Sequence, residues 1–129
     1  MLKDIKLIFS RTKKAKCFTR IIAAGLDYVG VSPILSYLHD KKRVRFTASA
    51  DEEVIAATKH LIRTEGIIPA LECSHAFASV IEEAHNIPDG AQVLINLSGR
   101  GDKDIFNIAE AIGDKKWEEF LCQKASLYQ

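Results

Sequence analysis

The sequence predicts an α/β fold, because two strand-like segments alternate with segments of helical periodicity. Residues 44–48 alternate apolar and polar side chains, which is typical of a half-buried strand. Residues 93–95, Val-Leu-Ile, form a short bare apolar run, which favours a strand covered on both faces. Two strands are few for an independent sheet of this class.

Five segments around these strands are expected to be helical, from apolar residues that recur at helical spacing and from residues typical of helix starts. They are residues 34–39, 49–66, 70–85, 103–112 and 115–124.

The predicted helix starts rest on specific residues. Pro33 suits the first turn of a helix because its φ is fixed. Ser49 followed by Glu52 has the spacing of a capping box, and Asp102 can cap the helix after it. The last helix is expected to bury three apolar residues: Trp117, Phe120 and Leu121.

Composition and charge exclude several classes of protein. The 129 residues are 47% hydrophobic and 27% charged, with a net charge of +1, so no overall field favours a nucleic acid or a membrane. No apolar run approaches the ~20 residues of a membrane span. The three cysteines are far apart and form no C-x-x-C pair, which fits a reducing compartment and a cytoplasmic location.

Basic residues are concentrated near the start of the chain. Residues 1–20 carry seven Lys or Arg against one acid, Asp4. A targeting presequence and a nucleic-acid-binding arm are both basic, but this stretch has little serine and no recognition module follows it. We expect residues 1–21 to be a solvated, poorly ordered leader, separate from the domain of residues 22–129.

The polar turn after Ile95 is the first candidate site. Ligands of α/β proteins bind beyond the carboxyl ends of strands, where Ser98 is expected to lie. The Gly99-Arg100-Gly101 sequence has neither the spacing of a P-loop nor that of a dinucleotide fingerprint. A plain strand-to-helix connection is the alternative.

The segment around Glu72 offers a second set of candidates. Cys73 and His75 do not form a dyad, because residues two apart on a helix point about 200° apart. His75 is expected to be a hydrogen-bonded packing residue. Glu72 directly follows an apolar run and therefore needs a partner. The other histidines have no metal-ligand spacing.

Three segments together resemble the C-terminal signatures of tryptophan synthase β chains, in the same order and at similar separations. They are residues 24–28 (AGLDY), 64–72 (TEGIIPALE) and 96–104 (NLSGRGDKD), and the resemblance runs from about Ile22 to the end. It implies the C-terminal part of a fold-type-II pyridoxal-phosphate enzyme, an incomplete parallel sheet with flanking helices. The implied reaction is that of a lyase of tryptophan biosynthesis, which condenses indole with L-serine. The implied assembly is a β homodimer with α subunits.

The resemblance also implies roles for individual residues. Ser98 would face the pyridine nitrogen of pyridoxal 5'-phosphate, with Gly99 and Arg100 in the same cofactor-binding turn. Glu72 would lie close to the cofactor, and Asp27 would belong to a lid over the serine-derived intermediate. The backbone carbonyls of Tyr28 and Gly30 would bind a monovalent cation.

The sequence departs from the family around the lid and beside the glutamate. Val29 replaces a usual proline, Ser32 a usual glycine, and Ile34 and Leu35 replace an acid or amide and a histidine. Cys73 stands where serine is common, a change of similar volume that we expect to be tolerated.

The family's Schiff-base lysine and its phosphate-binding loop match no segment of this sequence. We therefore expect a fragment that binds the cofactor without a covalent bond and is inactive alone, since groups that act as a unit fail together. Two alternatives remain: half of a split enzyme that needs an N-terminal partner, and a non-catalytic module that binds synthase subunits.

Overall fold

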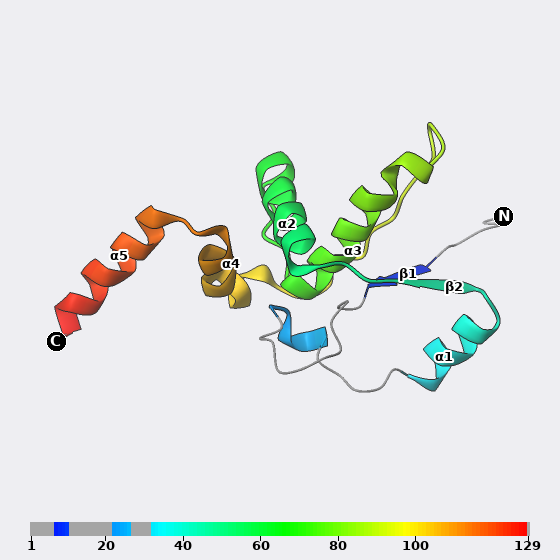
Figure 1. Ribbon diagram of the computed structural model, residues 1–129, viewed down its shortest axis with the longest axis horizontal. Helices are drawn as coiled ribbons and strands as arrows, with labels where there is room; N and C mark the ends of the chain where they lie inside the picture. Colours follow the sequence, from blue (N-terminus) through cyan, green and yellow to red (C-terminus); the bar gives the residue numbers. More distant parts are fainter. Residues whose placement is uncertain (1–6, 11–21, 27–31, 129) are drawn as a thin grey trace.

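The computed structural model describes residues 7–10, 22–26 and 32–128 (Figure 1). The predicted lid residue Asp27 and the predicted cation ligands Tyr28 and Gly30 lie outside the described residues.

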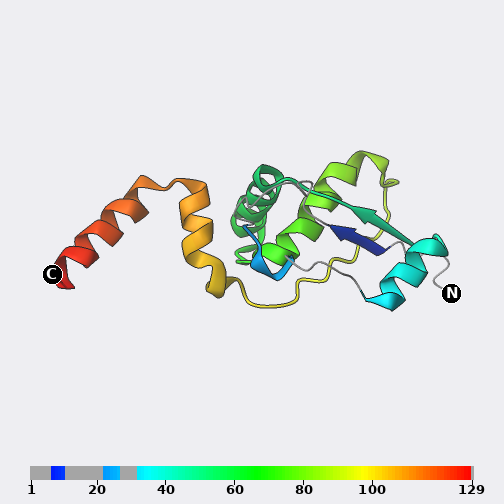
Figure 2. The same ribbon diagram turned by 60° about the horizontal axis from the view of Figure 1, so that its bottom comes forward.

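The strands of the described part form one parallel pair. Strand β1 (Leu7–Ser10) runs beside β2 (Val44–Thr47), with Leu7 opposite Val44 and Ser10 opposite Thr47. The first predicted strand, at residues 44–48, is therefore confirmed to within one residue. The four residues of β1 belong to the stretch that we expected to be poorly ordered. The described chain is mostly helical, so the predicted α/β class holds only in the coarse sense that helices flank a small parallel pair (Figure 2).

All five predicted helices are present, with shifted ends. The α-helices are α1 (Pro33–Asp40), α2 (Asp51–Glu65), α3 (Leu71–Glu83), α4 (Ile105–Ile112) and α5 (Lys115–Ala125). Short 3-10 helices lie at Ala24–Leu26, Ala84–Asn86, Gly101–Asp104 and Ser126–Tyr128. None of the helices in the described ranges has the length and apolar character needed to cross a membrane.

Both residues of the predicted capping box of α2, Ser49 and Glu52, were wrong by one position. The residue before the helix is Ala50, and its N–H donates to the Glu53 carboxylate at 2.6 Å. Ser49 is fully buried, and its hydroxyl lies 3.2 Å from that of Ser79. Its side chain therefore serves the contact between the end of β2 and α3, and Glu53 takes the expected role of Glu52.

Asp102 does not cap the fourth helix, which corrects a second prediction. Asp104 occupies the position before α4, and Asp102 instead accepts hydrogen bonds from Arg100. A 3-10 turn separates the glycine turn from the α-helix, and this turn moves the helix start two residues along the chain. The predicted start of α1 is confirmed, since Ser32 Oγ accepts the Ile34 N–H at 3.2 Å and Pro33 begins the helix.

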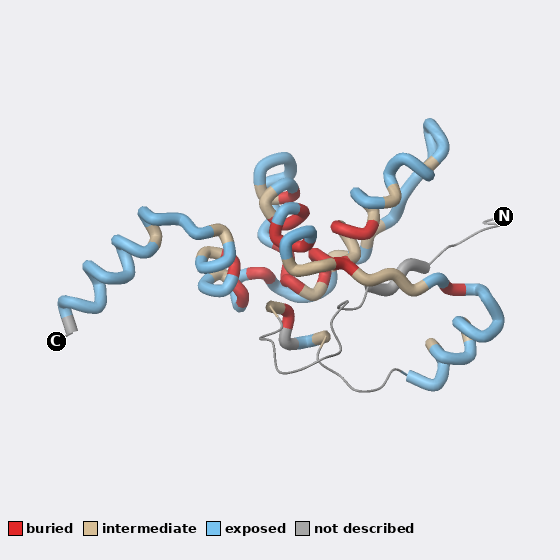
Figure 3. Tube along the Cα trace, viewed as in Figure 1, coloured by how far each residue is buried: buried red, intermediate tan, exposed pale blue. Residues whose placement is uncertain are grey.

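The core lies between α2 and α3, where Figure 3 shows the buried residues of the two helices facing one another. Leu71 and Val54 are completely buried there, and Ile108 from α4 closes one side. The full cluster also contains Ala23, Ile55, Ala57 and Ala78. Ala57 of α2 and Ala78 of α3 are small, which lets the two helices approach closely.

The prediction of a covered strand at residues 93–95 was wrong. The segment has no regular structure, and Leu94 is 98% and Val93 48% exposed. A parallel strand needs a neighbour to take its backbone hydrogen bonds. No described segment lies in that position, so the apolar run stays extended and uncovered.

The prediction that α5 buries its apolar face was also wrong. Phe120 and Leu121 are 43% and 38% exposed, and no α5 residue is buried. Trp117 stacks on Phe120, with ring centroids 5.5 Å apart, and contacts Phe106 of α4. The helix extends away from α2 and α3 (Figures 1 and 2), and its aromatic residues contact one another, Phe106 of α4 and Lys124 of α5 itself.

Gly101 is where the turn before α4 meets the segment before α3, and no larger residue fits there. A Cβ at this position would approach the Ile68 carbonyl oxygen to 2.1 Å and that of Pro69 to 2.6 Å. Both contacts are to backbone, so a side-chain rotation cannot relieve them. We expect Gly101→Ala to lower the unfolding free energy by about 1–3 kcal/mol in urea titrations, as overpacking does.

Gly113→Ala is the matched control, because a Cβ there meets nothing within 4 Å although φ is +67°. Only the cost of a left-handed backbone, about 1 kcal/mol, applies to it. In a background without Cys17 and Cys122, Gly101→Ala should also speed thiol labelling of Cys73, whereas Gly113→Ala should not. Equal labelling rates in the two variants would contradict the proposed contact.

Candidate functional site

The candidate site is built on the buried first turn of α3. Ala70 and Leu71 are 3% and 0% exposed, and Ala70 has no side-chain acceptor for the free N–H groups of the helix start. The Asp104 carboxylate supplies one, accepting the Leu71 N–H at 3.0 Å. The turn that ends at Asp104 is therefore fixed against α3.

Glu72, the next residue, is held by donors from two other segments. Its Oε1 accepts the Gly25 N–H at 3.0 Å, and Lys103 Nζ lies 2.9 Å from Oε2 and 3.2 Å from Oε1. A Cβ on Gly25 would fall 2.5 Å from Glu72 Oε1. The absence of a side chain at Gly25 is thus what allows this close approach.

Ser98 is held through its backbone while its side chain stays exposed. The Cys73 thiol donates to the Ser98 carbonyl oxygen, and Cys73 Sγ lies 3.6 Å from Ser98 Oγ. Gly99, which follows, has φ +84°, a conformation that favours glycine. Because Cys73 adjoins Glu72, the serine turn and the carboxylate are brought to the same end of α3.

Arg100 and Asp102 form an exposed pair within the same turn. Arg100 Nε donates to Asp102 Oδ1 at 2.8 Å, and a second hydrogen bond joins Nη2 to Oδ2. The hydrogen bonds from Arg100 lower the pKa of Asp102, and those to Asp102 raise the pKa of Arg100. The pair shapes the turn locally, since it spans only two residues.

The electrostatics of the site favour an ionised Glu72. Partial burial raises the pKa of this carboxyl, but the hydrogen bonds from Lys103 and Gly25 outweigh it and hold the pKa below its ordinary value. Burial lowers the pKa of Lys103, and the Asp104 and Glu72 carboxylates more than reverse this, so that its pKa is raised.

His75 is a packing residue, as predicted. It is 1% exposed, and its Nδ1 lies 2.8 Å from the Leu71 carbonyl oxygen one turn earlier in α3. It makes no contact with Cys73 that would support a dyad. Within the described residues, no three His, Cys, Asp or Glu side chains gather in a way that could hold a metal ion.

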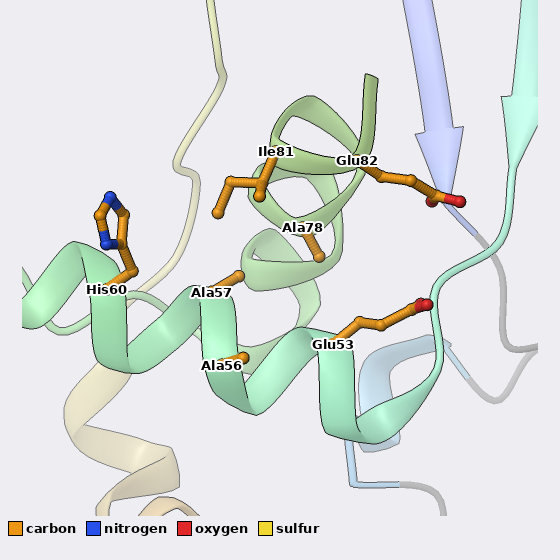
Figure 4. A pocket seen from close by; sticks show the side chains of 7 residues that line it. All are labelled: Glu53, Ala56, Ala57, His60, Ala78, Ile81 and Glu82. Carbon is orange, nitrogen blue, oxygen red and sulfur yellow. The ribbon is translucent and has the colours of Figure 1, made fainter. Parts of the chain in front are cut away.

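A separate groove of about 420 Å³ lies between α2 and α3 (Figure 4). Its floor is apolar, from Ala57, Ala78 and Ile81, while His60 lies toward one end and Glu53 and Glu82 toward the other. None of the candidate residues lines it. We therefore assign the site to the start of α3 and not to this groove.

The structure thus brings Glu72, Ser98 and Gly99 together, with Arg100 in the same turn. Sequence reasoning missed Lys103, which contacts the Glu72 carboxylate, and Asp104, which caps the start of α3. One signal pointed to them: a buried helix start at Ala70 has no capping side chain of its own, so an acceptor has to come from elsewhere in the chain. The individual cofactor and catalytic roles stay predictions.

Comparison with known proteins gives one consistent result. The chain is 45% identical over 106 residues to the tryptophan synthase beta chain of Helicobacter hepaticus, covering 82% of this chain and 25% of that protein. It is 51% identical over 94 residues to the tryptophan synthase beta chains of Rhodopseudomonas palustris strains TIE-1 and ATCC BAA-98 / CGA009, covering 73% of this chain and 23% of each protein. No family model matches the chain.

The fold and the site therefore describe one mostly helical segment of a protein, whose polar residues gather at a single turn beside a buried helix start. This chain is a homologue of part of the tryptophan synthase beta chains, which confirms the resemblance of the three motifs. It spans about a quarter of the length of the curated relatives it matches.

The hydrogen bond from Cys73 to the Ser98 carbonyl can be tested by substitution. Cys73→Ser keeps a donor of similar size and should change the unfolding free energy by less than about 0.5 kcal/mol. Cys73→Val fills the space but leaves the carbonyl without this donor, and we expect a loss of about 1 kcal/mol in urea titrations. Cys122→Val, at an exposed thiol on α5, is the control and should have no effect. A valine variant as stable as the serine variant would show that the hydrogen bond does not hold the turn.

Proposed function

We propose that this chain contributes the cofactor-facing turn and a neighbouring carboxylate to the active site of a tryptophan synthase β chain, in which indole is condensed with L-serine to give L-tryptophan. Pyridoxal 5'-phosphate, when bound, supplies the electron sink for this β-replacement. The observation that carries the proposal is the fixed turn at Ser98 beside Glu72, within a chain homologous to those enzymes.

The residues of the turn fit a planar, partly anionic ligand. Ser98 presents an exposed hydroxyl on a backbone held by Cys73, and Gly99 leaves the approach to that backbone open. A neutral hydroxyl facing the pyridine nitrogen cannot hold a proton there as a carboxylate would. A hydroxyl at this position would therefore weaken the cofactor as an electron sink and favour replacement at the β-carbon over the other reactions of the carbanion.

Glu72 serves this site as an ionised, oriented carboxylate. Its two oxygens are fixed by Gly25 and Lys103, so it faces the site without needing to reorganise. Asp27, one residue beyond the described 3-10 helix, would act as the lid residue, and the carbonyls of Tyr28 and Gly30 would bind a monovalent cation. Arg100 would shape the cofactor-binding turn.

The remaining groups of the active site would come from outside this chain's matched motifs. We propose that the segment is the C-terminal part of a fold-type-II enzyme, acts in the cytoplasm, and pairs within a β homodimer flanked by α subunits. The Schiff-base lysine and the phosphate-binding loop would be supplied by the rest of the β chain. Alone, the 129 residues would then form no tryptophan.

A chimera tests the proposal directly. Residues 22–129 of this chain would replace the corresponding C-terminal residues of the Rhodopseudomonas palustris beta chain. We expect the chimera to bind pyridoxal phosphate, seen by its absorbance, and to form tryptophan from serine and indole. Ser98→Ala in the chimera should lower kcat about ten-fold, the effect of losing about 1.4 kcal/mol of one polar contact.

Ser126→Ala is the matched control, because this exposed serine lies at the far end of α5 and its hydroxyl donates to the Gln123 carbonyl at 2.7 Å. Its kcat should equal that of the parent chimera. An inactive chimera that binds cofactor normally would contradict the proposed role of these residues. Tryptophan formation by the 129-residue chain alone would contradict the expected dependence on other segments.

The uncovered segment around Leu94 favours one alternative, a split enzyme completed by a separate N-terminal polypeptide. Mixing this chain with a relative's beta chain that lacks the matched residues should then restore cofactor absorbance and activity. If the chains associate without activity and the chain inhibits the intact relative, it is a binding module instead. Failure to associate would remove both alternatives.

A further inference from the structure

Four groups from two segments form a closed ring of contacts next to the site. Lys103 Nζ lies 2.7 Å from Asp104 Oδ2 and 2.9 Å from Glu72 Oε2. The same Asp104 oxygen accepts the Leu71 N–H at 3.0 Å, and Leu71 is bonded to Glu72 through the chain. The ring therefore joins the turn before α4 to the first turn of α3.

The helix start does not by itself need Lys103. Asp104 alone accepts the Leu71 N–H, and its side chain is 10% exposed. Lys103 adds contacts to both oxygens of Glu72, whose side chain is 23% exposed. Lys103 therefore contacts the capping carboxylate of Asp104 and, in addition, binds both oxygens of Glu72, which the cap itself does not require.

The two donors on Glu72 come from separate segments. Gly25 donates from its backbone, and the absence of a Cβ there lets the carboxylate come close. Lys103 donates from the turn that also carries Ser98. Among the described residues, Asp104 is the other charged group in this cluster, and it faces Glu72 across the Lys103 ammonium. Without that ammonium, Glu72 would lie near a second carboxylate with no cation between them, which disfavours the ionised form of Glu72.

We infer that Lys103 is the positioning residue for Glu72: it fixes the orientation of the carboxylate, keeps it ionised, and thereby ties the Ala24–Leu26 segment to the Ser98 turn. This inference rests on the proposed function for its catalytic meaning. The contacts themselves belong to this chain and can be tested without cofactor.

The test is a pH titration of the full 129-residue chain by NMR, with carbon-13 in the glutamate carboxyl groups and nitrogen-15 in the amides. Glu72→Gln assigns the Glu72 signal. In the unsubstituted chain, Glu72 should titrate below its ordinary value of 4.5, and the Gly25 amide should follow the same midpoint. Lys103→Met should move both midpoints to higher pH, whereas Lys103→Arg should keep them low because it retains the charge.

Lys115→Met removes an exposed lysine from α5 and is the matched control, with unchanged midpoints expected. Identical Glu72 midpoints in the parent and in Lys103→Met, with native amide spectra, would overturn the inference. If Lys103→Met lacks a native spectrum, Glu72→Gln decides. This variant should lower the midpoint of Lys103, followed at its ε-carbon, and no change would equally overturn the inference.

In the active chimera, Lys103→Met can also be tested through the pH dependence of kcat, which a purely structural role of Lys103 would leave unchanged. If ionised Glu72 is required, activity falls as the pH drops through the pKa of Glu72. Raising that pKa by Lys103→Met should then shift the acid limb of kcat to higher pH, with rescue by Lys103→Arg. A normal acid limb in Lys103→Met would overturn the catalytic meaning, while an inactive parent chimera would count only against the proposed function.

Discussion

The start of α3 places a single constraint on the molecule: a helix begins in a fully buried position, at a residue that has no capping side chain. The free N–H groups there need acceptors, because an unpaired buried donor costs about 1–3 kcal/mol. Asp104, 33 residues further along the chain, meets that need at Leu71. The turn that carries Ser98 is therefore pinned to α3 by a requirement of the backbone, and the chemistry of the site builds on that contact.

The close backbone approach at Gly101 follows from the same constraint. For Asp104 to reach Leu71, the turn has to pass against the carbonyls of Ile68 and Pro69, where no Cβ fits. The Ile67-Ile68-Pro69 segment thus does more than connect two helices, since it forms the surface on which the turn lies. From the next two positions of the helix, Glu72 then contacts Lys103 and Cys73 contacts the Ser98 carbonyl. Contacts between residues 25 to 33 positions apart in the sequence thus bring a carboxylate and a serine to the same end of α3.

The sequence predicted the helices well because their signals are local. Pro33, Gly66 and the apolar spacing of α2 and α3 each act within a turn or two of the chain. The predictions that failed depended on partners. The run at Val93 and Leu94 has the composition of a covered strand but no strand beside it in the described part, and α5 has an apolar face with only α4 to meet it. Lys103 was overlooked for the same reason, because its partner Glu72 lies 31 residues away in the sequence.

These uncovered surfaces bear directly on how the site would work. Leu94 is almost fully exposed and lies four residues before Ser98, in an extended segment whose backbone has no ladder. Such a segment is a template for strand addition. A neighbouring strand would order residues 93–97 and, through them, the amino-terminal side of the serine turn, whose other side is already fixed by Asp104. Anything that binds only the ordered turn stabilises that ordering by mass action. Covering of the segment and binding at Ser98 are therefore thermodynamically linked, each strengthening the other.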